Sequence, residues 1–336
     1  MATTLESKAA NEPETQATLR NYWHPLCMSE DVVEQPRGYM LLDESIVAFR
    51  DAKGVAAFKD LCIHRGTALS LGAITDGRLT CAYHGWQYDR TGACVHIPAL
   101  PPGASIPRKA RAIVYRAEER YGIVWVALDE PVASIPDWPH VSDPDPEYEY
   151  FLAGRWVWSS SAGRAIENGM DFSHFNFVHR GLTELADGPV IKHHEVRQMP
   201  GGIAYEYDDS LITRKYRVYI PFTLHDEKVE RNGNTSVVTI ITSPRTSTTT
   251  EVYTFITRNH ASAIALKGKG DVQNRDAVRA MVAEVFNQDR RIVESQRPEQ
   301  IPTDLRDELH LKVPDANALL YRRLLSNIGG IAAHMP

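Results

Sequence analysis

Two cysteines and two histidines form a pattern that could bind a redox metal centre. Cys62 and His64 are separated by one residue, and after sixteen intervening residues Cys81 and His84 are separated by two. This ligand set suits a two-iron, two-sulfur cluster, because replacing two thiolates by neutral imidazoles raises the reduction potential to about −150 to +300 mV. Zinc also takes two cysteines and two histidines. Zinc fingers, however, group a Cys pair and a His pair, whereas each half of this pattern holds one of each, which favours the cluster.

A second group of potential ligands occupies thirteen positions from Glu167 to His179. On a helix, Glu167, Asp171 and His174 would share one face, because their spacings are four and three residues. His179 would lie about 140° away from His174 around the same helix. Both imidazoles can therefore reach one ion only if the helix ends or bulges between them, and Asn176 or the bend that follows His179 could provide this break.

A third candidate ligand, Asp289, lies within an apolar stripe of three-four spacing between residues 277 and 296. A carboxylate on a buried helical face is costly unless a cation compensates its charge. His174, His179 and Asp289 would form a two-histidine, one-carboxylate triad, which suits ferrous iron and leaves positions open for dioxygen. Alternatively, the two histidines could be core residues beside aromatic rings, and Asp289 could pair with Arg290 or a more distant arginine.

Both groups of ligands carry a resemblance to one enzyme family. The segments Cys62-x-His64-Arg65-Gly66 and Cys81-x-x-His84-Gly85-Trp86 resemble the two ligand loops of a Rieske domain. The segment Glu167-x3-Asp171-x2-His174-x4-His179 resembles the mononuclear iron motif of Rieske non-haem iron oxygenases, and residues 286–296 resemble the helix bearing their third ligand. The resemblance covers roughly residues 23–323. It reaches the single-subunit-type group of methylxanthine N-demethylases, vanillate and dicamba O-demethylases and saxitoxin-pathway hydroxylases.

The resemblance implies two cofactors and a source of electrons. It implies a terminal oxygenase that consumes O2 and receives electrons from NAD(P)H through a separate ferredoxin or flavin reductase, and this chain has no Gly-rich dinucleotide turn. The sequence departs from many relatives at Gln288, where an acid often precedes the ligand aspartate. The implied ligands are Cys62, His64, Cys81 and His84 for a [2Fe-2S] Rieske cluster, and His174, His179 and Asp289 for a mononuclear Fe(II).

Asp171 stands three residues before the first iron histidine. In similar proteins an aspartate at this position hydrogen-bonds a cluster histidine of the neighbouring subunit. The resemblance therefore implies that Asp171 is the electron-transfer bridge between the two centres, with His64 or His84 as its partner. Such contacts imply a head-to-tail ring, which closes as a homotrimer. Alternatively, Asp171 only orients His174, as carboxylates beside metal-binding histidines commonly do.

Composition limits the classes of protein to which the chain can belong. Its 336 residues, 43% of them apolar, are enough for two domains. The formal net charge of −6 offers no basic surface of the kind that nucleic acids or anionic lipids require, so neither partner is expected. We expect a cytoplasmic protein, because no apolar run reaches the roughly 20 residues that span a membrane and no signal peptide is evident.

The chain divides into a tail and two domains, and its fold class is predicted to be α+β. Residues 1–18 are polar and predict a disordered tail, and residues 19–137 hold β-rich runs that predict a small antiparallel β domain carrying the Rieske motif. Residues 131–147 contain five prolines and predict a linker. Residues 138–336 are expected to form the catalytic iron domain, an antiparallel sheet flanked by helices. The segments that alternate as strands do are 202–207, 217–222, 236–242 and 251–257.

Together these observations predict an oxygenase that hydroxylates a small aromatic or heteroaromatic compound, as in aromatic catabolism. We expect attack on a methyl or alkyl group attached to nitrogen or oxygen, because the product is an unstable hemiaminal or hemiacetal that releases an aldehyde. The motifs do not separate this dealkylation from ring or alkyl carbon hydroxylation without loss of carbon. Two other classes stay open, namely a Rieske electron carrier without a catalytic iron and a zinc-stabilised binding protein.

Overall fold

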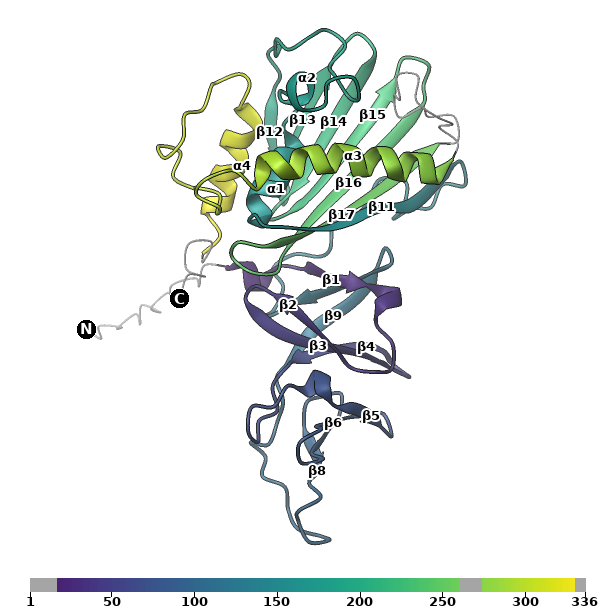
Figure 1. Ribbon diagram of the computed structural model, residues 1–336, viewed down its shortest axis with the longest axis vertical. Helices are drawn as coiled ribbons and strands as arrows, with labels where there is room; N and C mark the ends of the chain where they lie inside the picture. Colours follow the sequence, from purple (N-terminus) through teal and green to yellow (C-terminus); the bar gives the residue numbers. More distant parts are fainter. Residues whose placement is uncertain (1–16, 260–273, 330–336) are drawn as a thin grey trace, which may run out of the picture.

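The computed structural model describes residues 17–259 and 274–329. Within these residues the molecule is elongated and built on three antiparallel sheets, two in the N-terminal part and a larger one in the C-terminal part (Figure 1). The predicted α+β class, with a small β domain and a larger sheet flanked by helices, is confirmed. The predicted tail, residues 1–18, lies almost wholly outside the described residues.

A six-stranded sheet joins the two halves of the molecule. Its end strand β1 is followed along the chain by η2 (Ser29–Asp31) and preceded by η1 (Leu19–Asn21), which are single 3-10 turns. Four of its strands have buried central residues, which are 24–27, 46–49, 55–58 and 123–127. The order across the sheet is β1 (His24–Met28), β10 (Ile123–Ala127), β9 (Val114–Arg120), β4 (Gly54–Lys59), β3 (Glu44–Asp51) and β2 (Arg37–Leu41).

A small four-stranded sheet lies at the far end of the molecule (Figure 1). One apolar core joins it to β3 and β4, and both Cys62 and Cys81 are part of this core. The two cysteines are therefore held by packing as well as by the backbone of their loops. The strands are β5 (Ala73–Thr75), β6 (Arg78–Thr80), β7 (Gln87–Tyr88) and β8 (Cys94–His96), and the 3-10 turn η3 (Leu69–Leu71) precedes them.

The large C-terminal sheet has seven strands, all paired with antiparallel neighbours. Three predicted segments, 202–207, 236–242 and 251–257, lie within strands, but 217–222 is wrong because it spans a strand end and the following turn. The order is β11 (Tyr148–Trp158), β17 (Thr250–Asn259), β16 (Thr235–Pro244), β15 (Thr223–Glu230), β14 (Ile212–Tyr219), β13 (Gly202–Asp208) and β12 (Val196–Met199).

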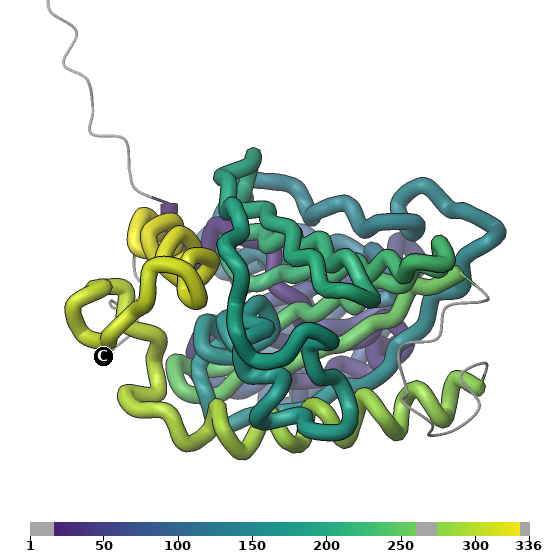
Figure 2. Tube along the Cα trace, turned by 90° about the horizontal axis from the view of Figure 1, so that it is seen from above, coloured from purple at the N-terminus to yellow at the C-terminus, as the bar shows by residue number. Residues whose placement is uncertain are grey.

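Four helices among the described residues accompany this sheet, and α3 crosses one of its faces (Figures 1 and 2). Helix α3 begins after Asn274, whose side chain accepts a hydrogen bond from the amide of Asp276 at 2.8 Å. Its buried residues are Val278, Val282, Phe286, Asp289 and Val293, so Asp289 lies on a buried face as predicted, whereas Ile292, which the predicted stripe included, is 47% exposed. The helices are α1 (Ala162–Met170), α2 (Phe175–Val178), α3 (Arg275–Val293) and α4 (Ala316–Ser326).

The proline-rich segment 131–147 contains no strand or helix and connects the two halves. Trp138 on this segment is buried against Tyr121, Tyr150 and Phe255, with ring centroids 4.2, 5.9 and 5.1 Å away. These aromatic contacts join the β9–β10 turn, β11 and β17 through one indole ring, because Tyr121 lies in the two-residue turn between β9 and β10. No helix of the described residues is long and apolar enough to cross a membrane.

Candidate metal centres

The two predicted cluster loops close in the same way. Cys62 follows β4 and Cys81 follows β6, and both are only 2% exposed. The amide of Gly66 donates to the carbonyl of Cys62 at 2.9 Å, and the amide of Gly85 donates to that of Cys81 at 3.0 Å. Both glycines have left-handed backbone angles, with φ of 72° and 68°, which side chains rarely tolerate. Each loop is therefore a tight turn of fixed shape with a histidine between its cysteine and its glycine.

The histidines of the two loops lie side by side. The rings of His64 and His84 have centroids 4.5 Å apart, and His64 also stacks on Trp86 at 4.5 Å. Nδ1 of His64 is buried and has no hydrogen-bond partner among the described residues. Sγ of Cys62 lies 3.1 Å from the hydroxyl of Tyr88. Two thiols and two imidazoles in adjoining loops, with one orphaned ring nitrogen, are a donor set that fits a [2Fe-2S] cluster.

The segment around the other predicted ligands contains a helix end before His174. Helix α1 ends at Met170, and Asp171 has an extended backbone with ψ of 140°. The carboxylate of Asp171 accepts hydrogen bonds from the amide and hydroxyl of Ser173 at 2.8 and 2.6 Å, which favours a turn over a continued helix. His174 and His179 then stand at the two ends of the one-turn helix α2. The predicted shared helical face of Asp171 and His174 is therefore wrong.

Three side chains from distant parts of the chain converge at α2. Nε2 of His174 and Nε2 of His179 are 3.1 Å apart. Oδ1 of Asp289, on α3, lies 3.0 Å from Nε2 of His179 and 3.4 Å from that of His174. Their ligand atoms all lie within 4.8 Å of one another, and His179 and Asp289 are only 1% and 6% exposed.

The outer nitrogen of each imidazole has an oxygen partner. Nδ1 of His174 lies 3.0 Å from Oδ2 of Asp171, and Nδ1 of His179 lies 2.9 Å from Oε1 of Gln288. Because both partners are acceptors, Nδ1 carries a proton, and in the neutral imidazole the lone pair of Nε2 faces the common centre. Two lone pairs and a carboxylate oxygen directed at one point fit a metal cation. The contact of Gln288 with His179 was not predicted, although its position directly before Asp289 and its departure from many relatives pointed to this residue.

The two candidate centres lie toward opposite ends of the elongated molecule. The turns that carry Cys62 and Cys81 are next to the small sheet, whereas α2 lies at the end of the large sheet that is away from the six-stranded sheet (Figure 1). Because the rate of electron transfer falls steeply with distance, this separation disfavours direct electron transfer between the two centres of one chain.

Comparison with known proteins identifies the family. Residues 22–114 match the family described as "Rieske [2Fe-2S] domain", and residues 208–329 match "Vanillate O-demethylase oxygenase C-terminal domain". Methylxanthine N1-demethylase NdmA of Pseudomonas putida is 29% identical over 331 residues, covering 92% of this chain and 89% of that protein. The structure of an NdmA mutant with theobromine matches with a TM-score of 0.81 at 30% identity, covering 92% of this chain and 90% of that one. The chain belongs to the Rieske non-haem iron oxygenases.

Two further relatives agree with this assignment. The vanillate O-demethylase oxygenase subunit of a Pseudomonas species is 32% identical over 177 residues, covering 51% of this chain and 49% of that protein. The dicamba monooxygenase structure has a TM-score of 0.75 at 22% identity, covering 93% of this chain and 98% of that one, and supports the fold. As a Rieske oxygenase, the protein is an oxidoreductase that uses a [2Fe-2S] cluster, a mononuclear iron and O2, with electrons from a separate reductase or ferredoxin.

Electrostatics within this oxygenase keep the triad carboxylate charged. Burial disfavours the ionised form of Asp289, but hydrogen bonds from His174 and His179 outweigh it and hold its pKa at about 2. Burial likewise opposes the charged form of His174, yet its hydrogen bonds to Asp171 and Asp289 raise its pKa to about 9. Each imidazole therefore lies next to the negatively charged carboxylate of Asp289, and this environment favours binding of a cation.

The end of α1 is held from two sides, which fixes the start of the iron motif. The carbonyl of Met170 accepts hydrogen bonds from the hydroxyl of Tyr205 and, at 2.7 Å, from Nδ2 of Asn317 on α4. These donors replace the partner that the helix end lacks. Asp171 therefore begins its turn from an anchored residue, and the C-terminal helix of the oxygenase takes part in shaping the triad.

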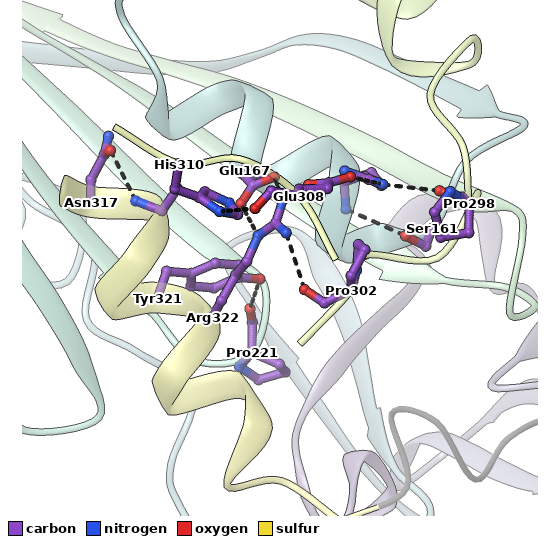
Figure 3. Close-up of polar contacts among 12 residues, drawn as sticks. Ser161, Glu167, Pro221, Pro298, Pro302, Glu308, His310, Asn317, Tyr321 and Arg322 are labelled. Atoms are coloured by element: carbon purple, nitrogen blue, oxygen red, sulfur yellow. Dashed lines mark hydrogen bonds and ion pairs between the residues drawn. The ribbon is translucent and has the colours of Figure 1, made fainter. Parts of the chain in front are cut away.

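A buried network of ion pairs joins α4 to α1 at Glu167, about one helical turn before Met170 (Figure 3). Arg322 is 2% exposed and donates to Oε1 and Oε2 of Glu167 at 2.6 and 2.7 Å, and to Glu308 at 2.7 Å. Arg164, which is 3% exposed, donates to Glu308 at 2.6 Å. Glu167 therefore faces α4 instead of the iron ligands. We call Arg322, Glu167, Glu308 and Arg164 the α1–α4 clamp.

A cavity of about 140 Å³ lies beside the triad. Its walls come from strands β14 to β17, from α2 and from α3, and most of its lining is aliphatic or aromatic. Phe175 and Phe286 contribute rings next to His174 and Asp289. A larger cavity of about 440 Å³ between the N-terminal segment and β14–β15 contains none of the triad residues. The smaller cavity is therefore the one from which a molecule could reach the triad.

Proposed function

We propose that this oxygenase hydroxylates an N-alkyl or O-alkyl group, chiefly methyl, of a small aromatic or heteroaromatic compound. The hydroxylated carbon then leaves as an aldehyde when the hemiaminal or hemiacetal breaks down. The observation that carries this proposal is the convergence of His174, His179 and Asp289 on one point at the wall of an apolar cavity. Relatives named as methylxanthine N1-demethylase and vanillate O-demethylase support dealkylation.

The proposal assigns the ligands residue by residue. Cys62, His64, Cys81 and His84 would hold the cluster, and His174, His179 and Asp289 would hold the iron. When bound, the cluster supplies single electrons and the ferrous iron supplies oxygen activation. Asp171 and Gln288 keep the protons on the Nδ1 atoms, so that both Nε2 atoms stay available to the metal. The apolar cavity wall would exclude water and hold the aromatic ring.

We further propose that the electron passes between chains at Asp171. Its side chain is about one-third exposed, although it also holds His174, so one face stays accessible to a neighbouring molecule. The cluster loops and α2 lie at opposite ends of the chain, and a head-to-tail neighbour would bring one chain's His64 or His84 to another chain's Asp171 (Figure 1). Such a ring would close as a homotrimer. In this arrangement residues 19–137 would act as the electron-donating domain and residues 138–336 as the catalytic domain.

The test of function is a coupled assay with a surrogate reductase. Iron-loaded protein is mixed with NADH, the reductase and a panel of N-methylated and methoxylated aromatics, and formaldehyde is measured. Dealkylation predicts formaldehyde and the demethylated product in equal amounts. A product heavier by one oxygen atom, without formaldehyde, would instead support ring or alkyl carbon hydroxylation. Iron content separates the electron-carrier alternative, because a carrier holds about two irons per chain and an oxygenase about three.

The electron path has its own test. Asp171→Asn should keep both metal centres but slow reoxidation of the reduced cluster by O2 and substrate by about 100-fold or more, because the proposed bridge loses its charge. Ser173→Ala is the control, since it removes one donor to the other carboxylate oxygen and leaves the contact of Asp171 with His174. Reoxidation of Asp171→Asn at the wild-type rate would contradict the bridge.

A further inference from the structure

The cavity of about 440 Å³ lies between the N-terminal and C-terminal parts of the molecule. One side of it is the chain around the start of β1, in the six-stranded sheet, and another is formed by β14, β15 and β16 of the large sheet. Small-molecule sites are common at such interfaces between domains. We call this cavity the interdomain cleft. Its lining comes from β16 and from five further segments, which lie within residues 22–25, 132–136, 198–202, 219–223 and 324–328.

Strand geometry separates the interdomain cleft from the triad cavity. Tyr219, Thr223 and Ile241 are cross-strand partners in one row of β14, β15 and β16, and all three line the cleft. Ile240, which directly precedes Ile241, lines the triad cavity instead. Because consecutive side chains of a strand point to opposite faces, the sheet itself stands between the two cavities. The cleft is therefore a site apart from the triad.

The interdomain cleft also differs from the triad cavity in charge. Among the described residues, no Asp, Glu, Lys or Arg side chain contributes to its lining. A charged ligand in the cleft would lose hydration without gaining an opposite charge, which is costly. The cleft therefore favours an uncharged ligand. The triad cavity, by contrast, is lined by several charged side chains, namely Glu184, Asp209, Arg214, Asp226, Lys228 and Asp289.

Aromatic rings and unpaired hydroxyls supply the binding groups of the interdomain cleft. Four of its lining residues carry aromatic six-membered rings, namely Tyr22, Trp23, Tyr219 and Phe222. Burial raises the pKa of Tyr22 and of Tyr219, and neither hydroxyl has a hydrogen-bond partner among the described residues. Each hydroxyl can donate one hydrogen bond and accept others. A flat molecule with polar groups on its edge would use both the rings and the hydroxyls.

The volume of the interdomain cleft indicates the size of its ligand. About 440 Å³ falls within the range of about 300–1,000 Å³ that is usual for small-molecule sites. It is about three times the volume of an engineered cavity, about 150 Å³, that binds benzene. A single ring would leave much of the cleft without contacts, whereas two fused rings with polar substituents would fill more of it.

We propose that the interdomain cleft is a second binding site, which takes an uncharged aromatic compound of two fused rings with a carbonyl or N–H group on its edge. The rings pack against Trp23 and Phe222, and the edge groups bond the hydroxyls of Tyr22 and Tyr219. The bound molecule touches β1 and β14 to β16, so it bridges the two parts of the chain. This inference goes beyond the proposed dealkylation and does not depend on it, because the cleft contains no triad residue.

Binding of three probe compounds tests the class of ligand. The iron-loaded protein, kept without oxygen and without a reductase so that no turnover occurs, is titrated by calorimetry with quinolin-2-one, quinoline-2-carboxylate and pyridin-2-one. Quinolin-2-one should bind at least 10-fold tighter than the other two, because the carboxylate brings a charge and the pyridinone lacks a ring. Equal or tighter binding of either analogue, or no binding of quinolin-2-one, would overturn the proposal.

A pair of tryptophan variants locates the site. Ser134 is an exposed lining residue of the interdomain cleft, so Ser134→Trp should fill the cleft and weaken binding of quinolin-2-one at least 10-fold. Ala280→Trp is the matched control, since Ala280 is exposed on α3 and lines neither cavity, and it should bind like the wild type. Wild-type affinity in Ser134→Trp would place the compound elsewhere, for example in the triad cavity, and would overturn the proposal.

Removal of single hydroxyls tests the polar contacts without changing the shape of the cleft. Tyr22→Phe and Tyr219→Phe should each weaken binding of quinolin-2-one by about 2- to 10-fold, the usual range for one hydrogen bond. Tyr83→Phe, at an exposed tyrosine outside the cleft, is the control and should bind like the wild type. Wild-type affinity in both cleft variants would overturn the proposed site. If Ser134→Trp does not fold, this pair of conservative variants still decides.

Discussion

The two candidate metal centres differ in how the chain builds them. The cluster ligands lie in two similar turns, each with a cysteine, a histidine and a glycine in one short segment. The triad combines two histidines at the ends of α2 with an aspartate from the middle of α3. Local sequence spacing therefore describes the first site nearly completely, whereas the second exists only when two distant elements pack together.

Exposure separates the two centres as well. His84 on a cluster loop is exposed, while His179 and Asp289 of the triad are buried. An exposed edge suits a centre that exchanges electrons with another molecule, and a buried one suits chemistry from which water is excluded. The same difference predicts how each site fails, because the first depends on its own turns and the second on the packing of α1, α3 and α4.

Removal of single ligands gives the largest expected effect. Cys62→Ala should lose the cluster, with its visible absorption and about two of three irons, whereas His179→Ala should lose about one iron and keep the absorption. Both variants should lose turnover down to background. His193→Ala, at an exposed histidine, is the control and should keep all iron. Full iron content in His179→Ala, measured by metal analysis, would contradict the triad.

Opening the α1–α4 clamp should affect the triad and spare the cluster. Arg322→Met leaves Glu167 without its cation and removes one of the two arginines that pair with Glu308, and breaking a buried ion pair costs about 3–5 kcal/mol. We expect a loss near 3 kcal/mol, because the side chain of Glu308 is 28% exposed. Urea unfolding followed by far-UV circular dichroism measures the loss, and metal analysis should show less mononuclear iron with an intact cluster spectrum.

The adjacent Arg323 provides the control for the clamp. Its side chain is exposed, so Arg323→Met should change the free energy of unfolding by no more than about 0.5 kcal/mol. Equal losses of cluster and mononuclear iron in Arg322→Met would show that the two centres are not supported independently, and the comparison between them would then fail.

Sequence reasoning reached the fold class and several strands of each domain, but it failed where buried charges interrupt the pattern. Strand β15 carries Asp226, Glu227 and Lys228 in succession, so polar-apolar alternation does not reveal it. Asp226 and Lys228 face the cavity, and only the packed sheet shows this. Charged residues that line the cavity thus interrupt the hydrophobic pattern from which strands are recognised.

The iron motif was misread for a different reason. Helical spacing places Glu167, Asp171 and His174 on one face, but the side chain of Asp171 hydrogen-bonds its own following backbone and ends the helix. Glu167 instead faces Arg322, which lies far away in the sequence. Long-range ion pairs leave no local signal, so neither the clamp nor the contact between Gln288 and His179 could be predicted. The ligand roles of the triad and of the cluster residues stay predictions.

Loss of the Gln288 contact should have an intermediate effect. Gln288→Leu removes the acceptor for Nδ1 of His179, so the proton is no longer fixed there, and iron affinity should fall by about 10- to 100-fold. Competition with a chelator measures this affinity, while the cluster spectrum should not change. Gln288→Glu retains an acceptor and should restore affinity to at least the wild-type value. Wild-type iron affinity in Gln288→Leu would contradict a role for Gln288 in positioning His179 for the metal.

The smallest expected effect is a shift in the reduction potential of the cluster when the hydroxyl of Tyr88 is removed. Tyr88 lies 3.1 Å from Sγ of Cys62, and a hydrogen bond to a ligand sulfur stabilises the reduced cluster, which carries more negative charge. Tyr88→Phe should lower the reduction potential by about 20–60 mV, since one such bond contributes about 0.5–1.5 kcal/mol in a one-electron couple. Potentiometric titration of the visible spectrum measures this shift, and iron content should stay complete.

Tyr83→Phe is the matched control, because Tyr83 is 58% exposed and its ring centroid lies 3.8 Å from that of His84. Tyr83 hydrogen-bonds the thiol of Cys81 through its backbone, which the substitution leaves in place. Its potential should stay within a few mV of the wild type if the sulfur contact is the cause. An equal shift in both variants would mean that ring packing and water exclusion set the potential. The cluster would then depend on its surroundings as the triad does, and the contrast between a site built by local turns and a site built by packing would narrow.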